Sequence, residues 1–459
     1  MNTTTAENTR FADILAIGFG TTAAMWTVGY ACRLFGPAVP ATLIFILVLG
    51  VLLAGGVVVG RYTNRGTLGG VYVGLVSGLV NLLVVGSLIS GKTPNEIKSG
   101  ALLWIPGTIV VSLVLASFGA ALGGLRPRRA ARTPDWPGAL AIVAACATFV
   151  LLAAGGLVTG FDEGLAVVDW PNTEGYNMFL YPLARMTGGV YLEHAHRLLG
   201  SLVGFTTLML AVHVQITERR GALKALAWTA LGFVVVQGIL GGLRVTGHFT
   251  LSTRPADTDP KVVLAAIHGV FGQVVFATLV ALAVCRSRAW REAGARVPAL
   301  SASLDRIFES TLVIVLIGQL VLGALVRHFS WALDIMRYGL PIDPARLEAI
   351  GRWALMVHVS VAVLVILLGV TAGVRAWGIY QTIPRLRRLG SSLLLLLGIQ
   401  VGLGVAALIM AGNDASDHRP TALDVVVTTA HQVVGAALLA WTVMLLLWNH
   451  RLLAKPSPT

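Results

Sequence analysis

Twelve long runs of apolar residues dominate this sequence and restrict it to very few folds. Each run has about twenty residues, the length at which an α-helix crosses the ~30 Å hydrocarbon core of a bilayer. Backbone polar groups in a bilayer need internal partners, so runs of this length must be helical. We therefore predict an all-α integral membrane protein with about 12 transmembrane helices. They cover residues 11–33, 40–60, 68–90, 101–124, 138–160, 192–215, 223–245, 261–285, 307–327, 352–376, 391–412 and 423–448.

Composition agrees with this class. Hydrophobic residues make up 56% of the 459 residues and charged residues only 12%, whereas a soluble domain carries roughly 25% charged residues. A formal net charge of +13 would suggest nucleic acid as the partner of a soluble protein. Here the basic residues lie in short loops between apolar runs, as membrane orientation requires. We therefore exclude nucleic acid and expect the lipid bilayer as the surrounding medium.

The loop charges predict an orientation. With twelve helices, the most basic loops fall on one side, which the positive-inside rule identifies as cytoplasmic, together with both termini. The polar residues 1–10 precede an apolar run too long for a signal-peptide core, so we expect no cleavable signal. We predict a multi-pass protein of the cell (inner) membrane whose long loops 161–191 and 328–351 lie outside. The basic loops contain Arg61 and Arg65, Arg126–Arg132, Arg219–Lys224, Arg286–Arg296, Arg385–Arg388, and Arg451 with Lys455.

A polar, arginine-rich break at Arg126–Pro137 separates the first four predicted helices from the last eight. Residues 1–125 form a predicted four-helix transmembrane extension that contains none of the ten histidines and has no assigned role. Its glycines, as in Gly74–Gly78, are expected to let helices pack closely. The last eight helices are predicted to form two tandem four-helix bundle repeats, residues 138–285 and 307–450.

Histidine spacing indicates this duplication. His196 and His268 lie 72 residues apart (268 − 196), and His358 and His431 lie 73 apart (431 − 358). Each lies four to eight residues inside a helix that enters from the outside, which at 1.5 Å per residue is about 6–12 Å deep. A lone buried histidine is usually a hydrogen-bonded packing residue. Four at matched depth, in two similar pairs, favour ligands in the outer half of the bilayer.

The surroundings of these histidines favour heme iron over zinc. No cysteine or carboxylate stands beside His358 or His431 to complete a zinc site. Two imidazoles on facing helices with apolar walls suit a six-coordinate heme. The sequence therefore predicts two heme sites toward the outer face. The other histidines are predicted to be structural, near cytoplasmic ends (His213, His450) or at the outer surface (His194, His248, His328, His418).

The two predicted heme sites differ in charge. Glu193, His196 and Arg197 share one helix face by their three- and four-residue spacing, whereas the twin positions of Glu193 and Arg197 hold Leu355 and Val359. An acid beside one heme only suggests that this site performs chemistry while its twin carries electrons. Three arginines near outer helix ends, Arg197, Arg244 and Arg327, could pair with heme propionates. For Arg244 and Arg327, an anchoring role at the membrane interface is the alternative.

Several motifs, in order from about residue 138 to 450, resemble the heme A synthase family. They are Gly155–Gly160, Gly164–Pro171, Glu193–Gly200, Gln237–Arg244, Ile267–Gly269 and His431–Gly435. The resemblance implies a membrane oxidoreductase that oxidises the C8 methyl group of heme O to the formyl group of heme A, for heme-copper cytochrome oxidase. It implies that Glu193 is the essential acid, that His196 and His268 frame the substrate heme, and that His358 and His431 ligate heme b.

The chain departs from the family pattern in two places. Many members carry a cysteine pair in the first outer loop, and residues 161–191 have none; the four-helix extension has no counterpart either. Expected partners are heme O, an unidentified electron donor, heme O synthase and cytochrome oxidase assembly factors. The residues alone also allow two other functions. One is a di-heme b-type cytochrome that transfers electrons from quinol, although such a cytochrome has no use for Glu193. The other is a transporter with a histidine proton relay.

Overall fold

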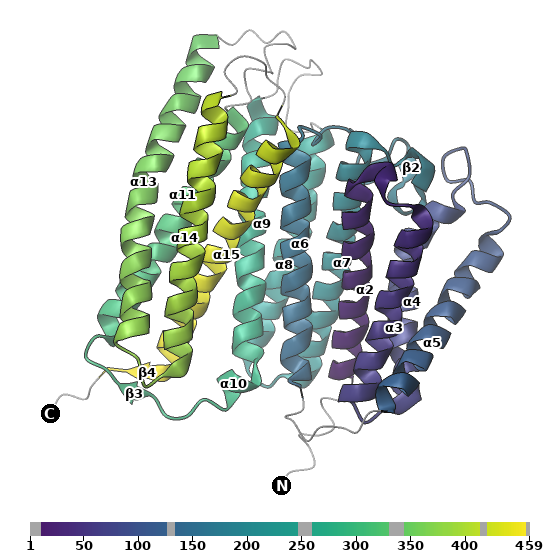
Figure 1. The fold of residues 1–459 in the computed structure, drawn as a ribbon, viewed down its shortest axis with the longest axis horizontal. Coiled ribbons are helices and arrows are strands. Elements are labelled where there is room, and N and C mark those ends of the chain that lie inside the picture. Colours follow the sequence, from purple (N-terminus) through teal and green to yellow (C-terminus); the bar gives the residue numbers. More distant parts are fainter. Residues whose placement is uncertain (1–10, 126–133, 247–258, 330–343, 414–419, 456–459) are drawn as a thin grey trace. The chain divides into compact units, whose positions relative to one another are not determined.

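The computed structural model describes residues 11–125, 134–246, 259–329, 344–413 and 420–455. The predicted all-α class is confirmed, because twelve helices in these ranges are long and apolar enough to cross a membrane (Figure 1). The chain is thus a multi-pass membrane protein. Predictions for residues 1–10, for the arginines of 126–132, for His248 and His418, and for residues 330–343 of the second long loop concern positions outside the described ranges.

Every predicted span overlaps one observed helix. The long helices are α2 (Ala12–Leu34), α3 (Ala41–Tyr62), α4 (Gly66–Ile89), α5 (Ala101–Gly124), α6 (Trp136–Gly160), α7 (Gly188–Thr217), α8 (Gly221–Thr246), α9 (Asp259–Arg286), α11 (Ala302–Phe329), α13 (Pro344–Gly378), α14 (Pro384–Asn413) and α15 (Ala422–Leu452). Two start well before the predicted span, α13 and α14. Both start at a proline, which suits the first helical position, and hydropathy detects only the apolar part of such helices.

The described connections contain short elements. They are η1 (Gly36–Ala38), β1 (Asn172–Thr173), β2 (Tyr176–Asn177), η2 (Met178–Leu180), η3 (Leu183–Arg185), α10 (Arg288–Arg291), β3 (Val297–Pro298) and β4 (Leu453–Ala454). β1 pairs antiparallel with β2, and β3 pairs parallel with β4. The segment between α6 and α7 is the most elaborate of these, with a hairpin followed by two 3₁₀ turns.

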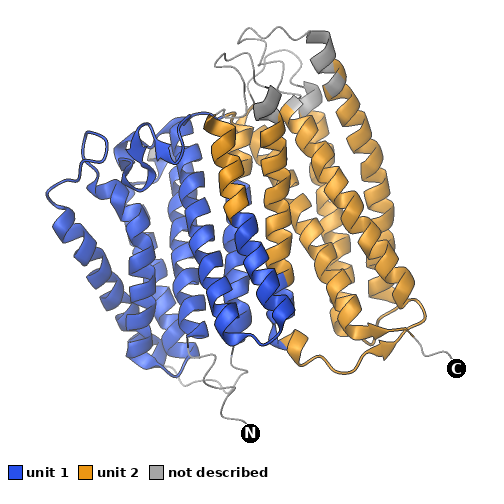
Figure 2. Ribbon diagram, turned by 180° about the vertical axis from the view of Figure 1, so that it is seen from behind, with its two compact units in different colours: residues 1–154, 163–234, 282–288 blue, residues 155–162, 235–281, 289–459 orange. Residues whose placement is uncertain are grey.

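The chain divides into two compact units (Figure 2). Unit 1 contains residues 1–154, 163–234 and 282–288, and unit 2 contains residues 155–162, 235–281 and 289–459. The extension α2–α5 therefore belongs to the same unit as α7. In unit 2, α11, α13, α14 and α15 pack in a ring, each against its two neighbours. The division into 1–125, 138–285 and 307–450, and the tandem duplication, stay predictions.

Glycines bring the helices of the extension close together. A Cβ atom added at Gly56 or Gly60 of α3 would lie 2.2 or 2.0 Å from the carbonyl oxygen of Ala116 or Ala120 in α5. One added at Gly74 of α4 would lie 2.4 Å from the carbonyl oxygen of Ser112. The expected close packing is thus observed, and side chains at these positions would separate α5 from its neighbours.

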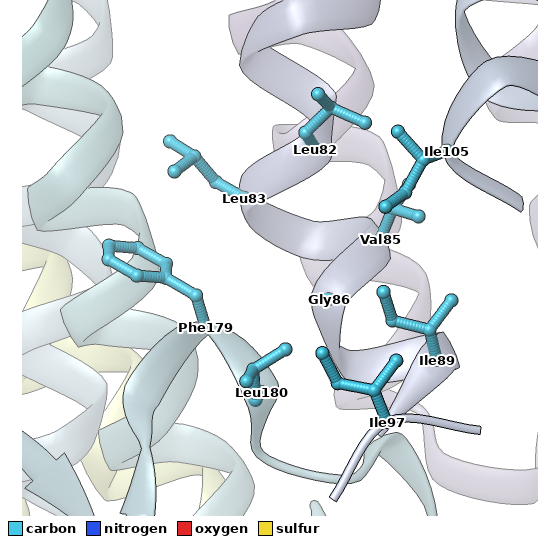
Figure 3. A pocket seen from close by; sticks show the side chains of 9 residues that line it. All are labelled: Leu82, Leu83, Val85, Gly86, Ile89, Ile97, Ile105, Phe179 and Leu180. Atoms are coloured by element: carbon cyan, nitrogen blue, oxygen red, sulfur yellow. The ribbon is translucent and has the colours of Figure 1, made fainter. Parts of the chain in front are cut away.

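A small apolar cavity of about 300 Å³ lies at one end of the extension (Figure 3). Its walls come from α4, from α5 and the turn before it, and from η2 of the α6–α7 segment. The lining residues are Leu82, Leu83, Val85, Gly86, Ile89, Ile97, Ile105, Phe179 and Leu180. The extension and the α6–α7 segment therefore share an apolar surface.

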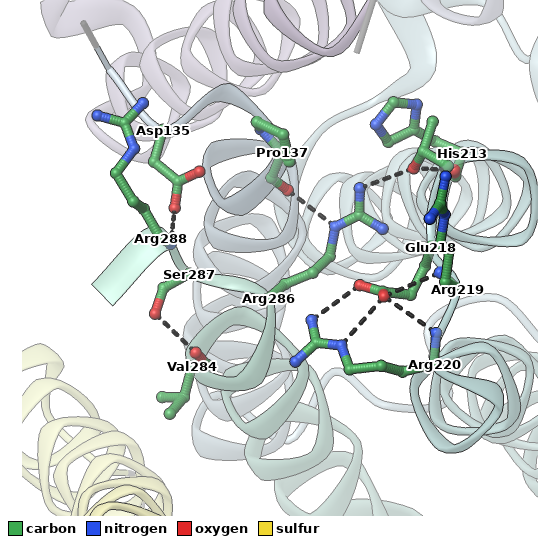
Figure 4. A network of polar contacts seen from close by, with 11 residues as sticks. Asp135, Pro137, His213, Glu218, Arg219, Arg220, Val284, Arg286, Ser287 and Arg288 are labelled. Carbon is green, nitrogen blue, oxygen red and sulfur yellow. Dashed lines mark hydrogen bonds and ion pairs between the residues drawn. The ribbon is translucent and has the colours of Figure 1, made fainter. Parts of the chain in front are cut away.

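Polar contacts join the helix ends on the opposite side of unit 1 (Figure 4). Arg286 is 2% exposed and donates hydrogen bonds to the Pro137 carbonyl at 3.1 Å and to Thr217 Oγ1 at 3.2 Å. Between α7 and α8, the hydrogen bond from Arg220 lowers the pKa of Glu218 to about 2. These contacts tie the start of α6 to the ends of α7 and α9.

We predict that Gly60→Ala destabilises the protein by about 1–3 kcal/mol, because the added methyl group forces α5 away from α3. The measurement is the thermal unfolding midpoint of the purified chain. Gly50→Ala is the matched control on the same helix, where an added Cβ meets nothing within 4 Å. It should be neutral or stabilising by up to about 1 kcal/mol through helix propensity. Equal midpoints for the two variants would contradict the packing described here.

Candidate functional site

A short hairpin organises the segment between α6 and α7. We call residues 163–187 the outer segment, after the side of the membrane predicted for it. Its strands pair Asn172 with Asn177 and Thr173 with Tyr176. Glu174 and Gly175 form the turn with φ of 49° and 79°, as a two-residue hairpin turn with both central residues at positive φ requires. The Asp169 carboxylate accepts the backbone N–H groups of both turn residues, at 2.9 and 2.8 Å.

Glu193 and Arg197 lie beneath this segment as a buried ion pair. Glu193 is 4% exposed, and its Oε1 atom lies 2.6 Å from an Nη atom of Arg197. Its other oxygen accepts the backbone N–H of Val167 at 2.8 Å. Both carboxylate oxygens thus have a donor, which fixes the orientation of the acid. The predicted shared face of Glu193 and Arg197 brings the two side chains together as expected.

Arg197 also binds the backbone of the outer segment. Its guanidinium donates to the carbonyl oxygens of Val167 and Asp169, each at 2.7 Å, and of Asn172 at 2.8 Å. A guanidinium has five N–H donors in a rigid plane, so one side chain can hold several loop carbonyls and the acid together. Arg327 donates to the Gly156 carbonyl at 2.8 Å, and Arg244 lies in the last turn of α8. For all three arginines, binding of heme propionates stays a prediction.

His194 corrects one expectation from the sequence. It was predicted to lie at the outer surface, but it is fully buried. Its Nδ1 atom lies 3.0 Å from Thr173 Oγ1, and its ring packs against Tyr181 at 5.0 Å between centroids. Burial, reinforced by a hydrogen bond to the Glu174 carboxylate, raises the pKa of the Tyr181 hydroxyl above its usual range. The outer segment folds over α7, and local sequence cannot show this.

The imidazole rings of the second predicted pair, His358 of α13 and His431 of α15, lie close to each other in unit 2. Their ring centroids are 6.4 Å apart, with 72° between the ring planes. Two imidazoles bonded to one metal ion at about 2.0 Å would have centroids about 6 Å apart. Both Nδ1 atoms are buried without a hydrogen-bond partner among the described residues. Since buried polar atoms normally have partners, this spacing fits a site completed by a bound group.

A glutamine and a glycine four residues apart stand beside each of these two rings. Gln319 of α11 donates to the His358 carbonyl at 2.9 Å, and its Nε2 lies 3.3 Å from the ring Nε2. A Cβ atom added at Gly323 would lie 3.1 Å from His358 Cε1. On α14, Gln400 Nε2 lies 3.4 Å from His431 Nε2, and a Cβ at Gly404 would lie 3.0 Å from His431 Cε1. Each glutamine, together with the glycine four residues after it, thus forms a close-fitting cradle around one histidine ring.

The same arrangement surrounds His268 in unit 2. Gln237 donates to its backbone carbonyl at 2.7 Å, and a Cβ at Gly241 would lie 3.0 Å from its Cε1 atom. Gln237 begins one of the sequence motifs, but the contacts of Gln319 and of the three glycines with these histidines were not predicted. The repeated Gln-x-x-x-Gly pattern, 31 or 39 residues before each histidine, was the available signal.

His196 differs from the other three predicted ligands. It belongs to unit 1 and its predicted partner His268 to unit 2, so their pairing stays a prediction. The sequence contains no glutamine before His196, so the Gln-x-x-x-Gly pattern does not precede this histidine.

Comparisons with known proteins agree with the motifs. A family model described as cytochrome oxidase assembly protein, COX15-CtaA, matches residues 176–443. No curated protein and no solved structure matches the chain. The family match covers more than half of the sequence, includes all four predicted ligands and leaves out the extension. The predicted resemblance to the heme A synthase family is thereby confirmed, and the chain belongs to the COX15-CtaA family of cytochrome oxidase assembly proteins.

Proposed function

We propose that this protein is a heme A synthase, which oxidises the C8 methyl group of heme O to the formyl group of heme A. Membership of a cytochrome oxidase assembly family supports the pathway. The observation that carries the specific reaction is the buried Glu193–Arg197 pair, one helical turn from His196. The corresponding residues beside His358 are Leu355 and Val359, which have no acid–base chemistry.

In this proposal the His358–His431 site holds heme b, which supplies electron transfer. The imidazoles of His358 and His431 would bind its iron. Gln319 and Gln400 contact the rings from one side, and Gly323 and Gly404 let the rings lie close to the backbones of α11 and α14. Groups around a metal ligand fix its orientation in this way and tune its affinity.

Heme O is the substrate, framed by His196 and His268. Oxidation of its methyl group moves protons and develops positive charge at the edge of the macrocycle. The Glu193 carboxylate can stabilise that charge and accept a proton. Arg197 and the Val167 N–H group keep it oriented before the reaction, so little reorganisation is needed when charge develops.

The surroundings of the enzyme follow from the same proposal. The bilayer dissolves the apolar substrate, with both termini cytoplasmic and both heme sites toward the outer face. Heme O synthase would supply the substrate, and assembly factors of cytochrome oxidase would receive the product. Because a methyl group becomes a formyl group, the reaction also needs an oxidant and a source of one oxygen atom, besides a separate electron donor.

His358→Ala or His431→Ala should abolish the low-spin heme b spectrum, because one imidazole cannot keep the iron six-coordinate. The measurement is the reduced absorption spectrum of the purified chain. His450→Ala is the control, since it removes an exposed histidine from the same helix as His431. A spectrum like that of the parent protein in either ligand variant would disprove the heme b assignment.

Gly404→Ala should weaken heme b binding by roughly tenfold, a typical effect of disturbing the groups that orient a metal ligand. The added methyl group presses on the His431 ring. Gly402→Ala, on the same helix and with nothing within 4 Å of the added Cβ, should bind heme b normally. The comparison is heme content per protein at equal expression, and equal contents would show that the cradle does not position the ring.

Glu193→Gln should retain heme b and lose heme A formation by about 10²–10⁴-fold, because the amide keeps the size but cannot accept a proton. The assay is co-expression with a heme O synthase, with extracted hemes identified by mass. Leu355→Gln introduces the same amide at the twin position and should leave the product unchanged. Undiminished heme A from the Glu193 variant would favour a di-heme electron-transfer cytochrome instead.

A further inference from the structure

We propose that the extension α2–α5 is a clamp that holds the outer segment over the Glu193–Arg197 pair and so positions the acid. The consequence for heme A formation rests on the proposed function; the clamp itself does not. All the contacts that carry it lie within unit 1.

The first set of contacts comes from α2. Arg33 donates to the Met186 carbonyl at 3.2 Å. Tyr191 donates to the Tyr30 carbonyl at 2.8 Å, and the two tyrosine rings stack with centroids 5.9 Å apart. Trp26 packs against the apolar cluster of the outer segment and is itself fixed by a 2.8 Å hydrogen bond to Asn81 of α4. One face of α2 therefore supports the C-terminal part of the outer segment and the start of α7.

The second set comes from the turn between α4 and α5. Tyr176 donates to the Lys92 carbonyl at 2.6 Å, and the Asn177 N–H donates to the Asn95 side chain at 2.9 Å. The turn is rigid, because the Glu96 carboxylate accepts the N–H groups of Lys92 and Thr93. These hydrogen bonds, with that from the Thr93 hydroxyl, lower the pKa of Glu96. Both residues of β2 are thus tied to a preformed part of the extension.

The third contact is a close approach of backbones. A Cβ atom added at Gly86 of α4 would lie 1.9 Å from the carbonyl oxygen of Phe179. Phe179 and Leu180 complete the apolar cavity beside it (Figure 3). The absence of a side chain at Gly86 lets η2 rest directly on α4.

The hairpin transmits this support to the acid. β2 contacts the extension, and its partner β1 contacts α7, where Asn172 accepts from Arg197 and Thr173 meets His194. The preceding residue Val167 donates to Glu193. Strands of two residues have almost no stability of their own, so their position depends on the surfaces on either side. The extension is one of those surfaces, and α7 is the other.

The test is hydrogen–deuterium exchange of the full-length protein in lipid nanodiscs. Gly86→Ala should speed exchange of the amides of residues 163–187, Val167 included, by about tenfold or more, because η2 can no longer rest on α4. Heme A formation should fall by a similar factor while heme b content stays at the parent level. Gly107→Ala, in α5 with nothing within 4 Å of the added Cβ, should match the parent protein in all three measurements.

A second pair of variants guards against misfolding. Asn95→Gly tolerates the φ of 63° at this exposed position and removes only the acceptor for Asn177. It should speed exchange at Asn177 about fivefold, as loss of one hydrogen bond does. Asn95→Asp keeps the acceptor, so its exchange rate at Asn177 and its heme A formation should match those of the parent protein.

Unchanged exchange in both Gly86→Ala and Asn95→Gly would overturn the clamp. Faster exchange with parental heme A formation would overturn the positioning of the acid. A parent protein that makes no heme A under any condition would instead refute the proposed function, and the exchange rates would still decide whether the extension holds the outer segment.

Discussion

Arg197 carries the interaction on which the site depends. Helices in a bilayer satisfy their own backbone groups, so the carbonyls that need partners lie in the connections. The outer segment directs three of them, from Val167, Asp169 and Asn172, at one guanidinium. The same guanidinium pairs with Glu193. A buried charge is tolerated only when it is paired and hydrogen-bonded, and here the pairing also orients the acid.

His268, His358 and His431 show how a membrane protein positions imidazole rings in an apolar environment. Gln237, Gln319 and Gln400 each contact a histidine of the next long helix, and a glycine one turn further along closes the cradle. Glutamine supplies a donor without a charge, which keeps its cost of burial low compared with an ion. The cradle recurs at three of the histidines of unit 2, His268, His358 and His431, whereas no glutamine precedes His196 in the sequence.

The extension gives this chain a way to restrain its outer segment without covalent links. Residues 161–191 contain no cysteine, and the family match does not include α2–α5. Contacts from Arg33, Tyr30, Lys92 and Asn95 reach the outer segment or the start of α7. Several such contacts together can restrain a segment, because the entropy cost of fixing its conformation is incurred once and every contact helps to offset it.

The sequence by itself determined the twelve spans, because the fixed thickness of the bilayer sets the length of each apolar run. It also identified the family, because the motifs and their spacing can be read along the chain. It also placed Glu193 and Arg197 on one helix face, which follows from helical periodicity. Only the tertiary structure decided that His194 is buried, that Arg197 binds the outer segment, that Gln319 and Gly323 hold His358, and that Lys92 and Asn95 support β2. Those contacts join residues far apart in the chain, from Thr173–His194 at 21 residues to Tyr176–Lys92 at 84. Their geometry depends on how helices pack, which no local pattern specifies.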